Sequence, residues 1–286
     1  MLMLLLLLVP ASDYQQQEKE WREGREARLK AEDGWLNLVA LYFLKEGSNT
    51  FGTGKDMDLA LPDHSTVPFT GTFFLENGVV RYELNRAQRG VINGEDKPEG
   101  TLRPATVDHP ADVLAHNNLR FFVIERGDKL ALRVRDLRAK AVRDFKPLKF
   151  YRARPDYEVE AEFVPFAVPE TITISTIIGT EYDAEVPGVL RFTWDEQPIE
   201  LWPVVEEDQL FIIFKDKTSG STTYPAGRFL YASKPDANNK VILNFNRAYS
   251  PPCAFTDFAT CPLPPAKNWL PVAIEAGEKF IAEGHQ

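Results

Sequence analysis

The sequence predicts a mainly β protein: two packed β-sandwich or barrel-like domains, with a surface helix near the N-terminus. Three observations support this prediction: 21 prolines among 286 residues, 12% aromatic residues, and short apolar segments separated by turn residues. A chain of this length buries roughly 75% of its unfolded surface, so it can fold without disulfides or metal ions.

The first predicted element is a helix within an arm over residues 12–33, which is polar and rich in charge. Asp13 is placed as the N-cap of this helix. Tyr14, Trp21 and Leu29 fall near heptad spacing and form a thin apolar stripe. We therefore expect the helix to lie against the body of the protein, with its arginine-rich face in solvent.

The strands are predicted from apolar runs and from alternation of apolar and polar residues. The clearest hairpin signal is Asn77-Gly78, which lies between two apolar runs. The predicted strands cover residues 38–44, 72–75, 79–84, 119–124, 130–134, 158–163, 171–175, 190–194, 210–214 and 241–246. We place the break between the domains near Lys146, which gives domains over residues 34–147 and 148–286.

The first eleven residues resemble a signal peptide. Met1 to Val9 is an unbroken apolar run, and Val9 and Ala11 fit the small-residue pattern that precedes a cleavage site. Nine apolar residues are too few to cross a bilayer of about 30 Å. No Lys or Arg precedes the run, which departs from the usual pattern. The sequence favours an exported protein, whether periplasmic, envelope-associated or extracellular, with a mature chain that begins near Ser12.

Cys253 and Cys261 are the two cysteines of the chain, and they lie eight positions apart. In an oxidising compartment such a pair can close a disulfide. Two buried, unpaired thiols are the alternative, and the sequence leaves both open. Neither cysteine belongs to a CxxC motif, and the four histidines are scattered, so we predict no metal site.

Charge and motifs exclude several classes of function. The net charge is −9 and no long basic tract interrupts it, so we expect neither nucleic acid nor an anionic membrane as the main partner. The segment from Gly52 to Asp56 looks like a phosphate-binding loop, but Asp56 stands where a Ser or Thr is required. No serine-nucleophile elbow or zinc-protease motif is present. We therefore predict no cofactor and no transmembrane segment.

The densest cluster of unexplained polar residues lies between residues 215 and 249. The candidate ligand-binding residues in it are Tyr224, Arg228, Asn244, Asn246 and Tyr249. Arg228 is the only arginine or lysine between Lys217 and Lys234, so a small anionic molecule or a peptide is the expected partner. The alternative is structural: Arg228 would pair with a carboxylate such as Asp216 or cap backbone carbonyls, and the asparagines would satisfy loop backbone groups.

The C-terminal half resembles a bacterial family known as domain of unknown function 1684. The residues that carry the resemblance are the strings DKTSG from Asp216, YPAGRFL from Tyr224, NFNRAYSPPCAF from Asn244 and TCPLPP from Thr260. Gly34-Trp35-Leu36 and the segment over residues 41–54 also look like this family. The resemblance implies no known reaction.

Residues 34–145 are faintly similar to a forkhead-associated (FHA) β-sandwich. Phe51-Gly52 and Asn93-Gly94 stand where such domains carry their signature residues. Thr53 replaces the phosphate-binding arginine, so the resemblance implies the fold without phosphothreonine binding.

Three classes of function remain. The first is a cell-envelope binding protein with a small-molecule or peptide pocket in its C-terminal domain. The second is a metal-independent enzyme that uses Tyr224, Arg228 and Cys253. The third is a structural or interaction module. Because no activated nucleophile or acid–base pair is evident, binding is favoured over catalysis.

Overall fold

The structure, a computed structural model, describes residues 11–280 of the chain. The described residues form two compact units. The C-terminal unit comprises residues 11–27, 147–254 and 260–280, and the N-terminal unit comprises residues 28–146 and 255–259. Each unit has its own hydrophobic core. The predicted mainly β architecture is confirmed, with an N-terminal helix and several sheets.

The N-terminal unit is a sandwich of two sheets, with strand orders β1-β11-β10-β9-β6-β7 and β3-β2-β4-β5-β8. Its elements are η1 (Trp35–Asn37), β1 (Leu38–Phe43), β2 (Gly47–Gly52), β3 (Leu59–Ala60), β4 (Gly71–Glu76), β5 (Val79–Leu84), β6 (Val91–Ile92), β7 (Glu95–Asp96), β8 (Glu99–Leu102), β9 (Leu114–His116), β10 (Leu119–Arg126), β11 (Lys129–Asp136) and α2 (Lys140–Arg143). Phe51 and Phe73 stack with ring centroids 4.5 Å apart, and Phe121 from the other sheet meets Phe51 edge-on. This aromatic cluster joins the two sheets.

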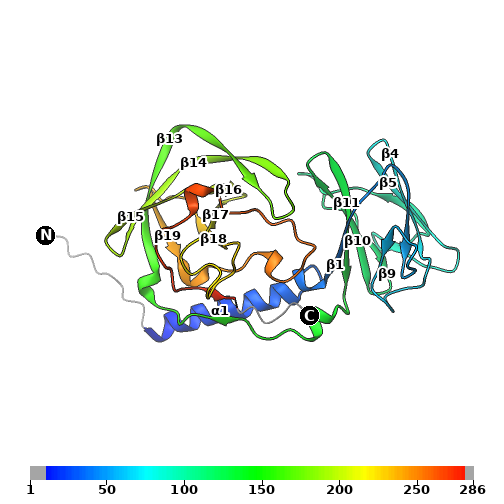
Figure 1. Ribbon diagram of the computed structural model, residues 1–286, viewed down its shortest axis with the longest axis horizontal. Helices are drawn as coiled ribbons and strands as arrows, with labels where there is room; N and C mark the ends of the chain where they lie inside the picture. Colours follow the sequence, from blue (N-terminus) through cyan, green and yellow to red (C-terminus); the bar gives the residue numbers. More distant parts are fainter. Residues whose placement is uncertain (1–10, 281–286) are drawn as a thin grey trace. The chain divides into compact units, whose positions relative to one another are not determined.

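The C-terminal unit contains three sheets, with strand orders β15-β14-β13-β19, β16-β17-β18 and β12-β20 (Figure 1). Its elements after the helix are β12 (Lys149–Phe150), η2 (Pro155–Tyr157), β13 (Glu158–Ser175), β14 (Glu181–Trp194), β15 (Gln197–Leu201), β16 (Val204–Glu206), β17 (Gln209–Phe214), β18 (Arg228–Ser233), β19 (Lys240–Asn244), η3 (Phe245–Arg247), η4 (Pro252–Ala254), η5 (Ala266–Asn268) and β20 (Glu278–Lys279). Phe214 and Phe245 lie in its core with no exposed surface, and their rings meet edge-on.

Strand β13 is longer than expected from the sequence, which predicts two separate strands there. It pairs with β19 over Glu158–Glu162 and with β14 over Glu162–Ser175. The register shifts between Pro165 and Glu170, where proline interrupts the ladder. A bulge accommodates a proline within a strand, so the chain continues through the interruption in an extended form.

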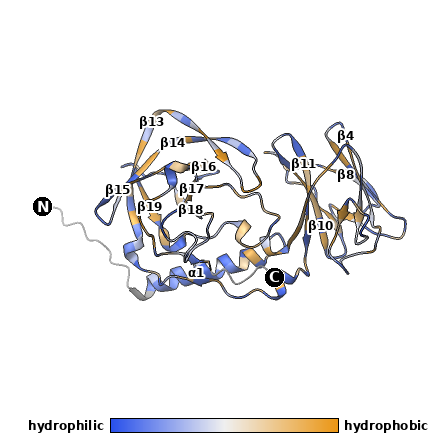
Figure 2. Cartoon of the chain, in the orientation of Figure 1, coloured by the Kyte–Doolittle hydropathy of each residue, from blue (hydrophilic) through white to orange (hydrophobic). Residues whose placement is uncertain are grey.

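Helix α1 (Ala11–Lys30) buries Tyr14 and Leu29 of the predicted apolar stripe, and it also buries two charged residues. Figure 2 shows α1 as mostly hydrophilic, yet Glu18 and Arg25 are 1% and 7% exposed. The prediction that its arginine-rich face lies in solvent is therefore wrong at Arg25. Tyr14, Glu18 and Arg25 follow the helical period, because each step is close to one or two full turns. Tyr14 and Leu29 of the predicted apolar stripe are also buried, at 8% and 0% exposure, so the buried residues of α1 are both apolar and charged.

Strand β19 ends earlier than predicted. It stops at Asn244, and Asn246 lies in the one-turn helix η3 that follows. The Asn244 side chain accepts a hydrogen bond from the Asn246 backbone N–H at 3.0 Å, which caps this turn. An asparagine side chain that bonds to the backbone two residues on favours a turn over a continued strand.

Candidate functional site

Arg228, the predicted cationic residue of the ligand site, is fully buried at the start of β18. Its Nη2 lies 3.2 Å from Oδ2 of Asp216, and both side chains have 0% exposure. Nη2 also donates to the Ile274 carbonyl at 3.0 Å, and Nη1 donates to the Ala276 carbonyl. Burial lowers the pKa of Arg228, and the Asp216 carboxylate opposes this shift. This is the structural arrangement that the sequence leaves open as the alternative.

Asp216 completes this buried network. Its Oδ2 accepts the Ile274 backbone N–H at 2.7 Å, and its Oδ1 accepts the Thr218 hydroxyl at 2.7 Å. The pair therefore ties the loop between β17 and β18 to the segment around Ile274. The ion pair and these hydrogen bonds offset much of the cost of burying the two charges, although Nε of Arg228 has no hydrogen-bond partner among the described residues.

Tyr224 and the two cysteines lie together elsewhere in the C-terminal unit. The Tyr224 hydroxyl donates to the Cys253 carbonyl at 3.0 Å. Both cysteines are buried free thiols, and the Cys253 backbone N–H lies 3.0 Å from Sγ of Cys261. Hydrogen bonding with Cys261 lowers the pKa of Cys253, while burial opposes this. Of the two alternatives that the sequence leaves open for this pair, the structure contains the two buried, unpaired thiols.

Asn246, by contrast, faces helix α1. It has no exposed surface, and its Nδ2 donates to the Tyr14 hydroxyl oxygen at 2.9 Å and to the Arg154 carbonyl at 2.8 Å. Its Oδ1 accepts the Arg154 backbone N–H at 3.0 Å. One amide therefore satisfies both backbone groups of residue 154 and also holds the first turns of α1.

Asn244 holds a second residue of α1. Its Nδ2 donates to Oε1 of Glu18 at 3.0 Å and to Oε1 of Glu158 at 2.7 Å, so two carboxylates share one amide group. Arg247 lies 2.9 Å from the same Glu18 oxygen. Oε2 of Glu18 is buried without a hydrogen-bond partner among the described residues. Partial burial and the nearby Glu18 charge raise the pKa of Glu158, while Arg247 opposes this.

Tyr249 contacts α1 through Arg25. The Arg25 guanidinium lies over the Tyr249 ring, 4.5 Å from its centroid, and Nη2 donates to the Ser250 carbonyl at 3.0 Å. The Arg25 Nε atom is 3.3 Å from Oε2 of Glu278, which is 1% exposed. Burial raises the pKa of Glu278, and Arg25 opposes this shift.

Three further residues of α1 bond to the backbone of residues 148–153. Gln15 and Arg22 donate to the carbonyls of Ala153 and Tyr151, each at 2.9 Å. The Leu148 backbone N–H donates to Glu26 at 2.8 Å. We call the part of the C-terminal unit that contacts α1 the α1-docking surface. It comprises Leu148, Phe150, Tyr151, Ala153, Arg154, Glu158, Asn244, Asn246, Arg247, Tyr249, Ser250 and Glu278.

Gly277 allows Glu278 to reach this surface. Its φ is +77°, and a Cβ atom at this position would lie 2.3 Å from the Ala248 carbonyl oxygen. The Glu278 backbone N–H donates to that same carbonyl at 2.8 Å. Only glycine combines this backbone conformation with so close an approach.

The structure therefore divides the predicted ligand residues. Asn244, Asn246 and Tyr249 come together at helix α1, whereas Arg228 and Tyr224 lie in other contacts. Glu18, Arg25 and Glu278 are not predicted from the sequence as residues of this site. The helical spacing of Tyr14, Glu18 and Arg25 was the available signal, but a search for amphipathic helices looks for apolar stripes.

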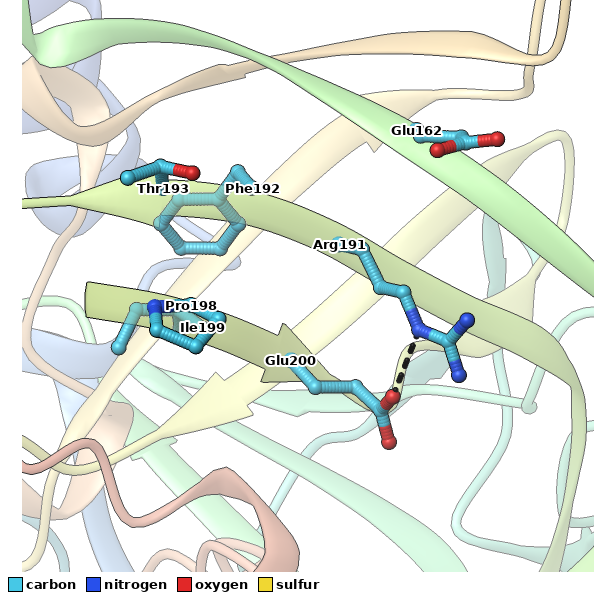
Figure 3. A pocket seen from close by; sticks show the side chains of 7 residues that line it. All are labelled: Glu162, Arg191, Phe192, Thr193, Pro198, Ile199 and Glu200. Atoms are coloured by element: carbon cyan, nitrogen blue, oxygen red, sulfur yellow. Dashed lines mark hydrogen bonds and ion pairs between the residues drawn. The ribbon is translucent and has the colours of Figure 1, made fainter. Parts of the chain in front are cut away.

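A shallow depression of about 330 Å³ lies on the face of the sheet formed by β13, β14 and β15 (Figure 3). It is lined by Glu162, Arg191, Phe192, Thr193, Pro198, Ile199 and Glu200. In Figure 3 the Arg191 side chain reaches toward Glu200, and their charged atoms are 3.0 Å apart. Arg191 and Glu200 are 57% and 39% exposed, so this pair is a surface ion pair. None of the predicted ligand residues lines the depression.

Within residues 11–280, no group of three or more His, Cys, Asp or Glu residues is arranged to hold a metal ion. Over the same part of the chain, no helix is long and apolar enough to span a bilayer.

In the N-terminal unit, the Thr53 backbone N–H donates to the Val67 carbonyl at 3.0 Å, which closes a turn after β2.

Comparison with known proteins adds a family but no activity. No curated protein matches the chain. An uncharacterized protein from Haloarcula marismortui, solved by solution NMR, is 32% identical with a TM-score of 0.42, covering 50% of this chain and 80% of its own.

Two FHA-domain structures are also similar to part of the chain. One is the FHA domain of FhaA in complex with the intracellular domain of another protein. It is 18% identical with a TM-score of 0.23, covering 32% of this chain and 96% of its own. The other comes from an analysis of phosphothreonine-dependent FHA interactions. It is 19% identical with a TM-score of 0.23, covering 34% of this chain and 95% of its own.

The family model that matches the chain covers residues 143–279, which include the DKTSG, YPAGRFL and NFNRAYSPPC strings. The chain belongs to the family described as Protein of unknown function (DUF1684).

Proposed function

We propose that this is an exported binding protein whose C-terminal unit recognises a peptide, and that the α1-docking surface is the peptide site. The observation that carries the proposal is that three of the five predicted ligand residues hold a helix. Asn244, Asn246 and Tyr249 contact Glu18, Tyr14 and Arg25, which lie on one side of α1. Under this proposal, helix α1 is the intramolecular occupant of the peptide site.

The chemistry of the contact supports an exchangeable segment. A permanently docked helix usually buries a purely apolar stripe, whereas α1 buries Glu18 and Arg25 in ion pairs beside the apolar Tyr14 and Leu29. Buried ion pairs add little net stability, because desolvation offsets much of the attraction. Contacts of this polar kind are typical of interfaces that open and close. Most residues of α1 are hydrophilic (Figure 2), which favours a released helix that stays in water.

The extent of the family match also supports this proposal. The docking surface lies within residues 143–279, whereas α1 ends at Lys30, outside the match. The surface is therefore a feature of the matched domain, and α1 is the segment that occupies it in this chain.

Export is proposed from the sequence pattern alone. The apolar run from Met1 to Val9 and most of the cleavage region lie outside the described residues. Its support is the length of the run and the small residues that follow it.

An enzyme built on Tyr224 and Arg228 has less support. The Arg228 guanidinium is fully buried and held by Asp216 and two carbonyl groups. The Tyr224 hydroxyl donates to the Cys253 carbonyl. Neither group is placed to meet a substrate in this arrangement.

The test is to add the helix as a separate peptide. A fluorescent peptide of residues 11–30 is titrated into the full chain and into the full chain carrying Arg25→Met. In the wild-type chain the tethered helix competes at an effective concentration in the millimolar range. The variant weakens this competitor, so we expect the peptide to bind it at least about tenfold more tightly.

A scrambled peptide of the same composition is the control, and it should bind neither chain. Hydrogen exchange of the α1 amides in the variant shows whether its own helix has left the surface. If α1 is released and the added peptide still does not bind, the surface is not a peptide site. The third class, a structural module with a fixed helix, would then be the better description.

A further inference from the structure

We infer that the α1-docking surface selects its partner by the order of charges along a helix. The partner is a helix that presents a tyrosine, then an acidic residue four positions later, then an arginine seven positions after that. In this chain those residues are Tyr14, Glu18 and Arg25. This inference rests on the proposed function and specifies the class of peptide that the site takes.

The spacing follows from helix geometry. Four residues make about one turn and seven make about two, so all three side chains project from one side. Seven residues advance the helix by about 10 Å. The surface must therefore offer a cation at one end and an anion about 10 Å further along. Arg247 and Glu278 fill these two roles.

Burial makes the two ion pairs selective. Glu18 and Glu278 are each 1% exposed, and Arg25 is 7% exposed. A helix with these charges exchanged would place an arginine against Arg247 and a carboxylate against Glu278. Buried like charges without partners are strongly unfavourable, so such a helix should be rejected.

The arginine position is the more selective of the two. Arg25 contacts the Glu278 carboxylate, the Ser250 carbonyl and the face of the Tyr249 ring. A planar guanidinium can make all three contacts at once, whereas the ammonium group of lysine is a single point charge. We expect lysine at this position to bind more weakly than arginine.

The acidic position tolerates more variation. Glu158 shares the Asn244 amide with Glu18, so a second carboxylate lies next to the ligand's own. The repulsion between them offsets part of the attraction to Arg247, as the raised pKa of Glu158 indicates. A neutral glutamine at position 18 of the peptide should therefore keep much of the affinity.

The remaining contacts of α1 contribute to affinity but do not depend on the order of charges along the helix. Gln15 and Arg22 donate to backbone carbonyls, which accept from any donor of suitable length. Lys19 and Glu23 form an ion pair on the outer side of α1, with side chains 65% and 66% exposed. Exchanging those two charges should leave binding almost unchanged.

The experiment compares peptides of identical composition. Three versions of the residue 11–30 peptide are titrated into the full chain carrying Arg25→Met: the native sequence, the buried swap Glu18→Arg with Arg25→Glu, and the exposed swap Lys19→Glu with Glu23→Lys. We expect the buried swap to weaken binding by at least about 100-fold. The exposed swap should stay within about twofold of the native peptide.

Two more measurements test which residues are responsible for the selectivity for charge order. A peptide with Arg25→Lys should bind about tenfold more weakly than the native peptide. In a chain that also carries Arg247→Met, the preference for Glu over Gln at peptide position 18 should disappear. Arg247 is 37% exposed, so this substitution leaves the core intact.

The outcomes separate the two proposals. If no peptide binds, the proposed function fails and the inference fails with it. If the native and buried-swap peptides bind equally well, the surface is a peptide site that does not read charge order, and only the inference is overturned.

Discussion

The C-terminal unit contains two buried arginine–carboxylate pairs that differ in what they join. Arg228 and Asp216 lie on one loop-to-strand segment, and their other partners are on the neighbouring stretch around Ile274. Arg25 and Glu278 join helix α1 to β20. Each pair involves residues of the family motifs: Asp216 and Arg228 themselves in the first, and Tyr249 and Ser250, which also contact Arg25, in the second. The first pair joins two segments of the sheet domain, whereas the second joins this domain to a helix that contributes no strand to its sheets.

The comparison shows that burial of a charged residue does not reveal its purpose. Arg228 has no exposed surface and Arg25 has very little, so both look structural by that measure. The position of the partner separates them. A pair closed within the sheets contributes to folding, whereas a pair with one member on a separate helix contributes to docking.

The largest expected effect is at Arg228. Replacement of Arg228 by Met leaves Asp216 buried without its cation, and we expect a loss of about 3–5 kcal/mol in the free energy of unfolding. Thermal or denaturant unfolding of the full chain measures it. Arg191→Met is the matched control, because its pair with Glu200 is exposed and should contribute less than about 1 kcal/mol. If the Arg228 and Arg191 variants were equally stable, Arg228 would not have the structural role described.

A smaller effect is expected for Arg25→Met. Loss of charged hydrogen bonds to Glu278 and Ser250 should weaken docking by about 2 kcal/mol. Faster hydrogen exchange across α1, with unchanged exchange in β17 and β18, is the expected signature. If β17 and β18 also lost protection, the pair would belong to the fold, and the contrast with Arg228 would disappear.

Tyr224→Phe should have a modest effect. It removes the hydroxyl that donates to the Cys253 carbonyl, at a cost of about 1 kcal/mol in unfolding free energy. Binding of the α1 peptide should be unchanged, because Tyr224 does not belong to the docking surface. A marked loss of peptide binding in this variant would contradict the boundary that we draw around that surface.

The smallest expected effect is a dependence of docking on pH. Partial burial and the charge of Glu18 on α1 raise the pKa of Glu158 above the ordinary value of 4.5, so protonation of Glu158 favours the docked state. Docking should weaken as the pH rises through the raised pKa of Glu158. Peptide titrations between pH 4 and pH 7 measure this change in affinity. In the Glu158→Gln variant the dependence of affinity on pH should become smaller. Tighter binding at higher pH would reverse the assigned sign.

Local patterns predicted much of the fold. The Asn77-Gly78 hairpin is present between β4 and β5, with both residues at positive φ. Alternation and apolar runs located β17 and most of the other long strands. The sequence predicts two strands where the structure has the single strand β13, because proline at position 165 cannot donate a hydrogen bond to the ladder. The bulge that lets the strand continue cannot be recognised from the sequence of one strand alone.

The site was predictable only in part. The motif drew attention to Asn244, Asn246 and Tyr249, but their partners on α1 lie more than 200 positions away in sequence. Pairing over such distances depends on tertiary packing, which no local pattern encodes. Arg228 was selected because it is a lone cation in a polar loop, and its burial against Asp216 follows from the same long-range packing.

Gly277 makes the docking of α1 sensitive to a single methyl group. The backbone at this position passes so close to the Ala248 carbonyl that any side chain would force the two segments apart. Glu278, the next residue, would move with it, and the anion that meets Arg25 would lose its position. An uncharged substitution at Gly277 can therefore act as a release for the helix. The affinity of the site for its own helix is in this way adjustable without any change to the side chains that touch the ligand.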